Sequence, residues 1–86
     1  RSAYELYLEG CRLDEDEATF ERAEEMYRRA LELDPTLANA LTNLGNVRFR
    51  RGFPEEAEVF YKLAVARNRE GRAGAAVDPL GASASA

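Results

Sequence analysis

Two stretches of the chain repeat one pattern of small and aromatic residues at helical spacing. Ala23, Tyr27 and Ala30 stand at positions i, i+4 and i+7. The same residue types return 34 positions later, at Ala57, Tyr61 and Ala64. This spacing places the side chains on one face of a helix, where small residues let a neighbouring helix approach and the tyrosine fills the space between. A repeat of this period predicts stacked helical units rather than a single closed core.

Apolar periodicity and capping residues together predict four helices. Thr19 and Thr36 are placed to cap the second and third helices, and Pro35 separates the two units. Gly52 suits a left-handed turn after the third helix, and Pro54 suits the first position of the fourth. The predicted helices span residues 3–13, 20–33, 37–51 and 54–68.

The first half of each unit repeats as well. Leu6 and Gly10 match Leu41 and Gly45 at an offset of 35, and the extra residue lies in the acidic turn at 14–17. The run Leu41-x2-Leu44-Gly45, followed by the small-aromatic-small pattern, resembles the helix-turn-helix unit of tetratricopeptide (TPR) proteins. This resemblance covers residues 3–68. It implies an all-α fold of two TPR-like hairpins, at about 3–35 and 36–69, stacked as a short solenoid.

Three positions depart from the TPR pattern. Glu9 stands where Leu44 stands in the second unit, Arg48 replaces a large apolar residue, and Arg69 takes the place of Pro35. Two units are also few for an array, because each unit buries its apolar face only against its neighbours. We therefore expect either that further repeats flank this chain or that a second copy completes its core.

The composition changes near the C-terminus, and it divides the chain into a two-repeat domain at 1–70 and a tail at 71–86. Gly, Ala and Ser dominate the tail. Few large apolar side chains remain there to offset the entropy of ordering. We predict that the tail is flexible, and a partner-binding segment at 77–80 is the alternative.

The residue content argues against catalysis and metal binding. The chain has no histidine and one cysteine, Cys11, so Cys-His and Ser-His-Asp arrangements cannot form and zinc binding is disfavoured. The acidic turn at 14–17 lacks the glycine and the terminal glutamate of an EF-hand loop. We predict that the chain is not an enzyme and has no cofactor and no metal.

The net charge and the hydropathy of the chain limit the classes of partner that it can bind. A net charge of −4 argues against nucleic acid, and no stretch approaches the ~20 apolar residues of a membrane span. One cysteine fits a reducing compartment, so we expect a cytoplasmic location. Because the chain begins with Arg1 and shows no signal peptide, we expect a processed or excised fragment. The expected partner is a protein or peptide.

A polar face on the third predicted helix is the first candidate surface. In a TPR array the first helices line a groove, and Asn46, within Leu-Gly-Asn, resembles the peptide-holding asparagine of some TPR proteins. Amides both donate and accept hydrogen bonds, so they can hold an extended backbone. The lysines that a full carboxylate clamp also needs are missing. The alternative is an ordinary exposed polar face. The predicted peptide-groove residues are Tyr7, Asn39, Thr42, Asn43, Asn46 and Arg50.

The fourth predicted helix supplies the second candidate surface. Position by position, Glu25 becomes Val59, Arg29 becomes Leu63 and Glu32 becomes Ala66, so this helix is apolar nearly all round. A helix without a polar face is normally covered on both sides. The alternative is a tolerated exposed surface. The predicted self-association residues are Val59, Tyr61, Leu63, Ala64, Val65 and Ala66.

These patterns predict a non-catalytic protein–protein interaction module. We expect it to self-associate as a dimer or larger homo-oligomer, through repeat stacking or hairpin exchange, and to bind a peptide in its groove. The alternative is a regulatory or scaffold fragment of a larger multi-repeat protein, such as a transcription regulator.

Overall fold

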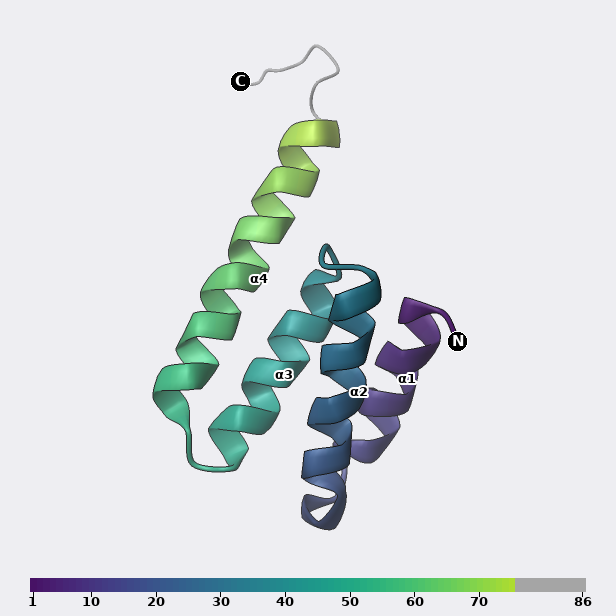
Figure 1. The fold of residues 1–86 in the computed structure, drawn as a ribbon. Helices are drawn as coiled ribbons and strands as arrows, with labels where there is room; N and C mark the ends of the chain where they lie inside the picture. The colour runs from purple at the N-terminus through teal and green to yellow at the C-terminus, as the bar shows by residue number, and fades with distance from the viewer. Residues whose placement is uncertain (76–86) are drawn as a thin grey trace.

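The computed structural model describes the backbone of residues 1–75 and the side chains of residues 1–70. Within this range the chain forms α1 (Ala3–Leu13), a short 3-10 helix η1 (Glu17–Thr19), α2 (Phe20–Leu33), α3 (Ala38–Arg50) and α4 (Pro54–Ala75). The helices lie side by side in chain order, and each packs chiefly on its neighbours in sequence (Figure 1). The predicted all-α fold of two helical hairpins is confirmed.

The helix starts combine predicted and unpredicted caps. Ser2 begins α1 with a capping box, in which its hydroxyl accepts from the Glu5 amide and the Glu5 carboxylate accepts from the Ser2 amide. Thr19 stands at the predicted N-cap of α2, but its hydroxyl donates to the carbonyl of Leu13 instead. Thr36 does not cap α3, because its hydroxyl donates to the Asp34 carboxylate and Leu37 takes the cap position.

The turn between α3 and α4 matches the prediction. Gly52 has a φ of 93°, a left-handed conformation that glycine adopts without a steric penalty. Pro54 is the first residue of α4, as expected from its fixed φ and missing amide proton. The helix then continues to Ala75, past the predicted end near Asn68, and it projects beyond the other three helices (Figure 1). Of the tail predicted at 71–86, residues 76–86 lie outside the described residues.

One apolar core lies between α1, α2 and α3. Tyr27 fills its centre and is fully buried, and Leu44 from α3 packs in the same cluster. Partly buried side chains close the edges of this core, among them Phe60 from α4. The other buried members of the cluster are Leu13, Phe20, Ala23, Ala40 and Val47.

Candidate functional site

Both hairpins are built around the same contact between a glycine and a tyrosine. A methyl group at Gly10 would lie 2.5 Å from the Tyr27 ring, and one at Gly45 would lie 2.7 Å from the Tyr61 ring. Only a residue without a side chain allows the two helices of each hairpin to approach this closely. The matching glycines and tyrosines found in the sequence are therefore the packing centres of the two hairpins.

The hydroxyl of Tyr27 joins α1, α2 and α3. It donates to the Asp14 carboxylate at 2.6 Å and accepts from the Asn43 amide at 3.4 Å. Burial, followed by the hydrogen bond to Asp14, raises the pKa of Tyr27 above its ordinary value. The phenol therefore stays protonated and available as a donor. Asp14, at the end of α1, is held in place by this bond.

A buried glutamate holds α3 against α2, and the sequence patterns did not reveal it. Glu24 is 2% exposed, and its carboxylate lies 3.2 Å from the Arg48 guanidinium and 2.8 Å from that of Arg51. Arg48 also binds Glu56, and this hydrogen bond raises the pKa of Arg48. Arg48, which stands where the TPR pattern has a large apolar residue, is thus the partner of the buried Glu24. The one feature of the sequence that could have revealed this cluster is the position of Glu24 beside Ala23, on the buried face of α2.

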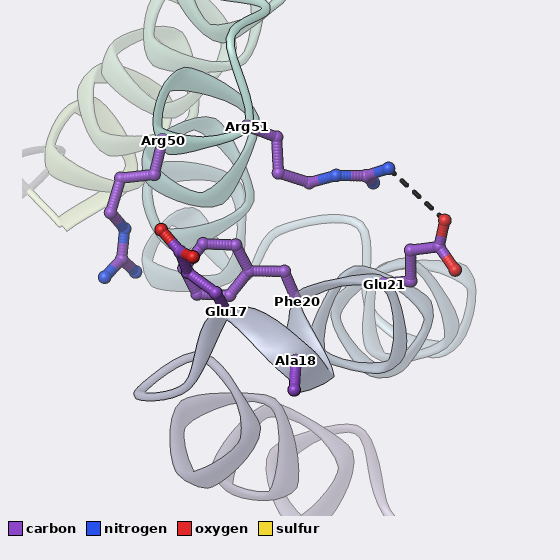
Figure 2. Close-up of a pocket in the computed structure, with 6 residues that line it drawn as sticks. All are labelled: Glu17, Ala18, Phe20, Glu21, Arg50 and Arg51. Atoms are coloured by element: carbon purple, nitrogen blue, oxygen red, sulfur yellow. Dashed lines mark hydrogen bonds and ion pairs between the residues drawn. The ribbon is translucent and has the colours of Figure 1, made fainter.

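Figure 2 shows the exposed end of the contact between α2 and α3. Arg51 reaches across to Glu21, 3.3 Å away, while Arg50 points to the other side of a hollow of about 410 Å³. Arg50 is also held internally, because its guanidinium donates to the Asp14 carbonyl and lies over the Phe20 ring at 4.9 Å. Glu17 and Ala18 complete the lining of the hollow.

On α4, the face that corresponds to the α3-binding face of α2 is exposed. Glu58 is the counterpart of Glu24, yet its side chain is 66% exposed and pairs along its own helix, with Lys62 at 3.6 Å. Tyr61 is half-buried where Tyr27 is fully buried, and Val65 is 50% exposed. These residues border a hollow of about 430 Å³. We call this surface the open face; its residues are Glu58, Tyr61, Lys62, Val65, Ala66 and Arg69.

The residues predicted for self-association lie on three different sides of α4. Tyr61, Val65 and Ala66 line the hollow of the open face. Ala64 is buried, like its counterpart in α2. Val59 and Leu63 are exposed but do not line that hollow. A helix turns about 100° per residue, so these two lie on a neighbouring side, called here the outer stripe.

The residues predicted for the peptide groove lie on α1 and α3, and several make internal contacts. Asn43 donates to Tyr27 and also lies 3.5 Å from the sulfur of Cys11, which ties α1 to α3. Tyr7 packs against Tyr27, with ring centres 6.1 Å apart and the rings tilted at 43°. Burial raises the pKa of Tyr7. Tyr7 and Asn43, two of the predicted groove residues, therefore take part in packing between the helices.

The other groove residues are more accessible or engaged elsewhere. Asn46 is exposed, and its side-chain oxygen accepts from the Tyr61 hydroxyl at 2.6 Å. Asn39 is exposed and Thr42 is half-buried. Arg50 makes the contacts with Asp14 and Phe20 described above. Exposed amides therefore remain at both ends of this face of α3.

The described residues contain neither a metal-binding group nor a membrane-crossing helix. Residues 1–75 hold no cluster of three or more His, Cys, Asp or Glu placed to bind a metal ion. Within the same range no helix has both the length and the hydropathy needed to cross a bilayer.

Paired helices that repeat one packing contact define a helical-repeat protein. The TPR repeat family model matches residues 19–52, which run from the end of η1 through α2 and α3 to Gly52. This match and the four described helices fit a protein of the TPR type, as the sequence resemblance implied. No curated protein and no solved structure matches the chain. TPR repeats are non-enzymatic modules that generally mediate protein–protein interaction.

Proposed function

We propose that this chain is a non-catalytic interaction module that self-associates through the open face of α4. One observation carries the proposal. α2 and α4 present corresponding faces; α3 covers the first, whereas the second is exposed at Glu58 and Val65 and half-buried at Tyr61. A surface that is a binding face in one half of the molecule is suited to the same task in the other. A second copy of the chain can supply the missing partner.

The gain from covering this face is modest but sufficient for a weak oligomer. Completing the burial of Val65, which is half exposed, contributes roughly 1 kcal/mol at the usual value for apolar surface. The tyrosine ring adds a comparable amount, and a symmetric pair doubles both contributions. We therefore expect a weak complex, with a dissociation constant near the millimolar range, rather than a tight one.

Self-association by stacking of two copies is favoured over exchange of hairpins between them. Exchange requires the turn at 14–17 to open. Three contacts tie that region closed: Tyr27 donates to the Asp14 carboxylate, Arg50 donates to the Asp14 carbonyl and Thr19 donates to the Leu13 carbonyl. All three would have to break or reform between chains. Stacking on α4 requires no such change.

The experiment is sedimentation equilibrium of wild type and Val65→Glu. We expect the wild type to populate a dimer or larger species and Val65→Glu to be a monomer of unchanged helicity. Leu33→Glu is the matched control, because Leu33 is a similarly exposed apolar residue on α2. A monomeric wild type would overturn the proposal and favour the alternative, a fragment that works within a larger multi-repeat protein such as a transcription regulator.

The outer stripe is a rival surface for the same function. Val59 and Leu63 replace the charged residues of α2 and remain exposed. The double substitution Val59→Glu with Leu63→Arg restores the charges found on α2. If this variant dissociates while Val65→Glu does not, self-association uses the outer stripe rather than the open face.

A second candidate function is peptide binding along α3. It is favoured by the exposed amides of Asn39 and Asn46, which lie on the same side of the helix. The test compares peptide-library binding to wild type, Asn39→Ala and the double variant Asn43→Ala with Asn46→Ala. Because Asn43 also contacts Tyr27, only Asn39→Ala separates ligand binding from packing. Equal binding by wild type and Asn39→Ala would count against the groove.

A further inference from the structure

The charges along the open face are arranged so that two copies of the face, running in opposite directions, bring an acidic residue opposite a basic one. Glu58 stands at one end and Arg69 at the other, Lys62 and Val65 lie between them, and Tyr61 and Ala66 lie at the two edges. When two such helices run antiparallel, the first residue of one faces the last of the other. A pair centred between residues 63 and 64 aligns Glu58 with the partner's Arg69 and Lys62 with the partner's Val65.

We propose that two copies pair through antiparallel α4 helices in this register, forming a closed two-fold dimer. The inference rests on the proposed self-association and names its geometry. The two-fold axis makes each favourable contact occur twice. Acid then meets base at both ends of the interface, and the aliphatic stem of each Lys62 lies beside the partner's Val65 in its centre. The same helices in parallel would place Glu58 against Glu58 and Arg69 against Arg69.

The small side chain of Ala66 keeps one edge of the open face clear for an approaching helix. Its counterpart on α2 is Glu32, an exposed acid. The position of α4 also permits the approach, because among the described elements α4 packs chiefly on α3 and lies at the edge of the row of helices (Figure 1).

Head-to-tail stacking of α1 onto α4 is disfavoured by the outward face of α1. Ala40, Leu44 and Val47 are the buried residues of α3 that pack in the core. Glu5, Glu9 and Arg12 occupy the corresponding positions of α1, and Glu9 pairs with Arg12. An incoming α1 would therefore bring charged side chains, rather than apolar ones, to the open face. Charged side chains lose hydration when they are brought against the apolar Val65, so stacking of α1 on α4 is less favourable than pairing of two α4 helices.

The test uses two charge reversals and their mixture. Glu58→Arg alone places two arginines together at each end of the homodimer, and Arg69→Glu alone places two glutamates together. At the energy of exposed ion pairs, two lost pairs weaken the dimer by about tenfold. In an equimolar mixture, however, every acid again faces a base. We expect the mixed dimer to recover to within about threefold of the wild-type dissociation constant. Sedimentation equilibrium measures all four samples.

The outcomes separate this geometry from the underlying proposal. If wild type dimerises and Val65→Glu does not, yet the mixture is no tighter than either variant alone, the open face is the interface and the antiparallel register is wrong. Charge reversals that leave the dissociation constant unchanged also overturn the register. If wild type is monomeric, or if Val65→Glu associates as strongly as wild type, both proposals fail. Circular dichroism of each variant excludes loss of folding as the cause.

Discussion

The two hairpins carry corresponding residues, yet they bury them to different degrees. Tyr27 is fully buried and hydrogen-bonded to two helices, whereas Tyr61 is half-buried and donates to Asn46 within its own hairpin. Glu24 is enclosed by two arginines, whereas Glu58 is exposed. The difference arises from the neighbour of each hairpin: α3 packs on the first, while the corresponding face of the second borders an exposed hollow. One motif thus supplies core in one place and surface in another.

Removing each tyrosine should give the largest difference between the hairpins. Tyr27→Ala deletes a fully buried ring, a change that costs about 3–5 kcal/mol for large aromatic residues. In a domain this small we expect that loss to abolish cooperative thermal unfolding. Tyr61→Ala deletes a half-buried ring and should cost no more than about half as much. Thermal melts followed by circular dichroism at low protein concentration, where any dimer dissociates, compare the two. Equal losses would contradict the assignment of Tyr27 as the centre of the core.

The buried glutamate should give the next largest difference. Glu24→Gln leaves the guanidinium groups of Arg48 and Arg51 without their shared carboxylate. We expect a loss of about 1.5–3 kcal/mol in the free energy of unfolding, the range for a hydrogen bond to a charged group, because Arg48 and Arg51 keep only Glu56 and Glu21 as partners. Glu58→Gln changes an exposed residue and should alter stability by less than about 0.5 kcal/mol.

Urea titration of the two glutamine variants measures both values at one pH. Glu56→Gln adds a control, because Glu56 binds the same Arg48 from an exposed position. If Glu24→Gln is as mild as Glu56→Gln, the buried cluster does not hold α3 against α2.

The helices and their order were predictable because local patterns determine them. Repeated small and aromatic residues identify the hairpins, and Gly52 and Pro54 mark a turn that needs a left-handed residue and then a helix start. The capping by Ser2 and the contact of Thr19 with Leu13 were not predictable, because several polar residues near a helix start compete for the same amides and only tertiary contacts decide among them. The predicted end of α4 was wrong because Gly71 does not stop the helix, and one glycine costs a helix only about 1 kcal/mol.

The candidate surfaces were predictable only in part. Comparing the two copies identified the unusual composition of α4, because a change from charged to apolar at fixed spacing is visible in the sequence. Dividing those residues into a buried side, an open face and an outer stripe requires knowing where α3 lies. The Glu24 cluster was not found, because a glutamate is ordinarily assigned to the surface and the two arginines of α3 and its cap that bind it lie 24 and 27 residues away, although Arg28 also pairs with it at i+4.

The paired glycines offer a smaller comparison. Gly10→Ala places a methyl group 2.5 Å from the ring of the fully buried Tyr27, and the ring cannot move without disturbing the core. We expect a loss of about 1–3 kcal/mol, as for other overpacked sites. Gly45→Ala meets the half-buried Tyr61, which can turn outward, and the gain in helix propensity of about 0.5–1 kcal/mol offsets part of the strain. Urea titration should therefore rank Gly10→Ala as the more harmful. The reverse order would show that the second hairpin is the more rigidly packed.

The helix starts give the smallest comparison, and it depends on pH. α1 begins with the capping box of Ser2 and Glu5, whereas Leu37 at the start of α3 forms no side-chain cap. The backbone hydrogen bond from Ser2 lowers the pKa of Glu5 below its ordinary value of 4.5. A lowered pKa means that the contribution to stability is present above about pH 4.5 and is lost as the pH falls through the folded-state pKa.

Glu5→Gln should therefore lower stability slightly at neutral pH and not at all in acid. Unfolding by urea, measured from neutral pH to about pH 3, gives the difference between wild type and variant. Glu15→Gln is the matched control, because Glu15 is an exposed glutamate outside any helix. A wild-type advantage over Glu5→Gln that persists unchanged in acid would mean that the carboxylate charge is not what stabilises the start of α1. The distinction between the two helix starts would then rest on the Ser2 hydroxyl alone.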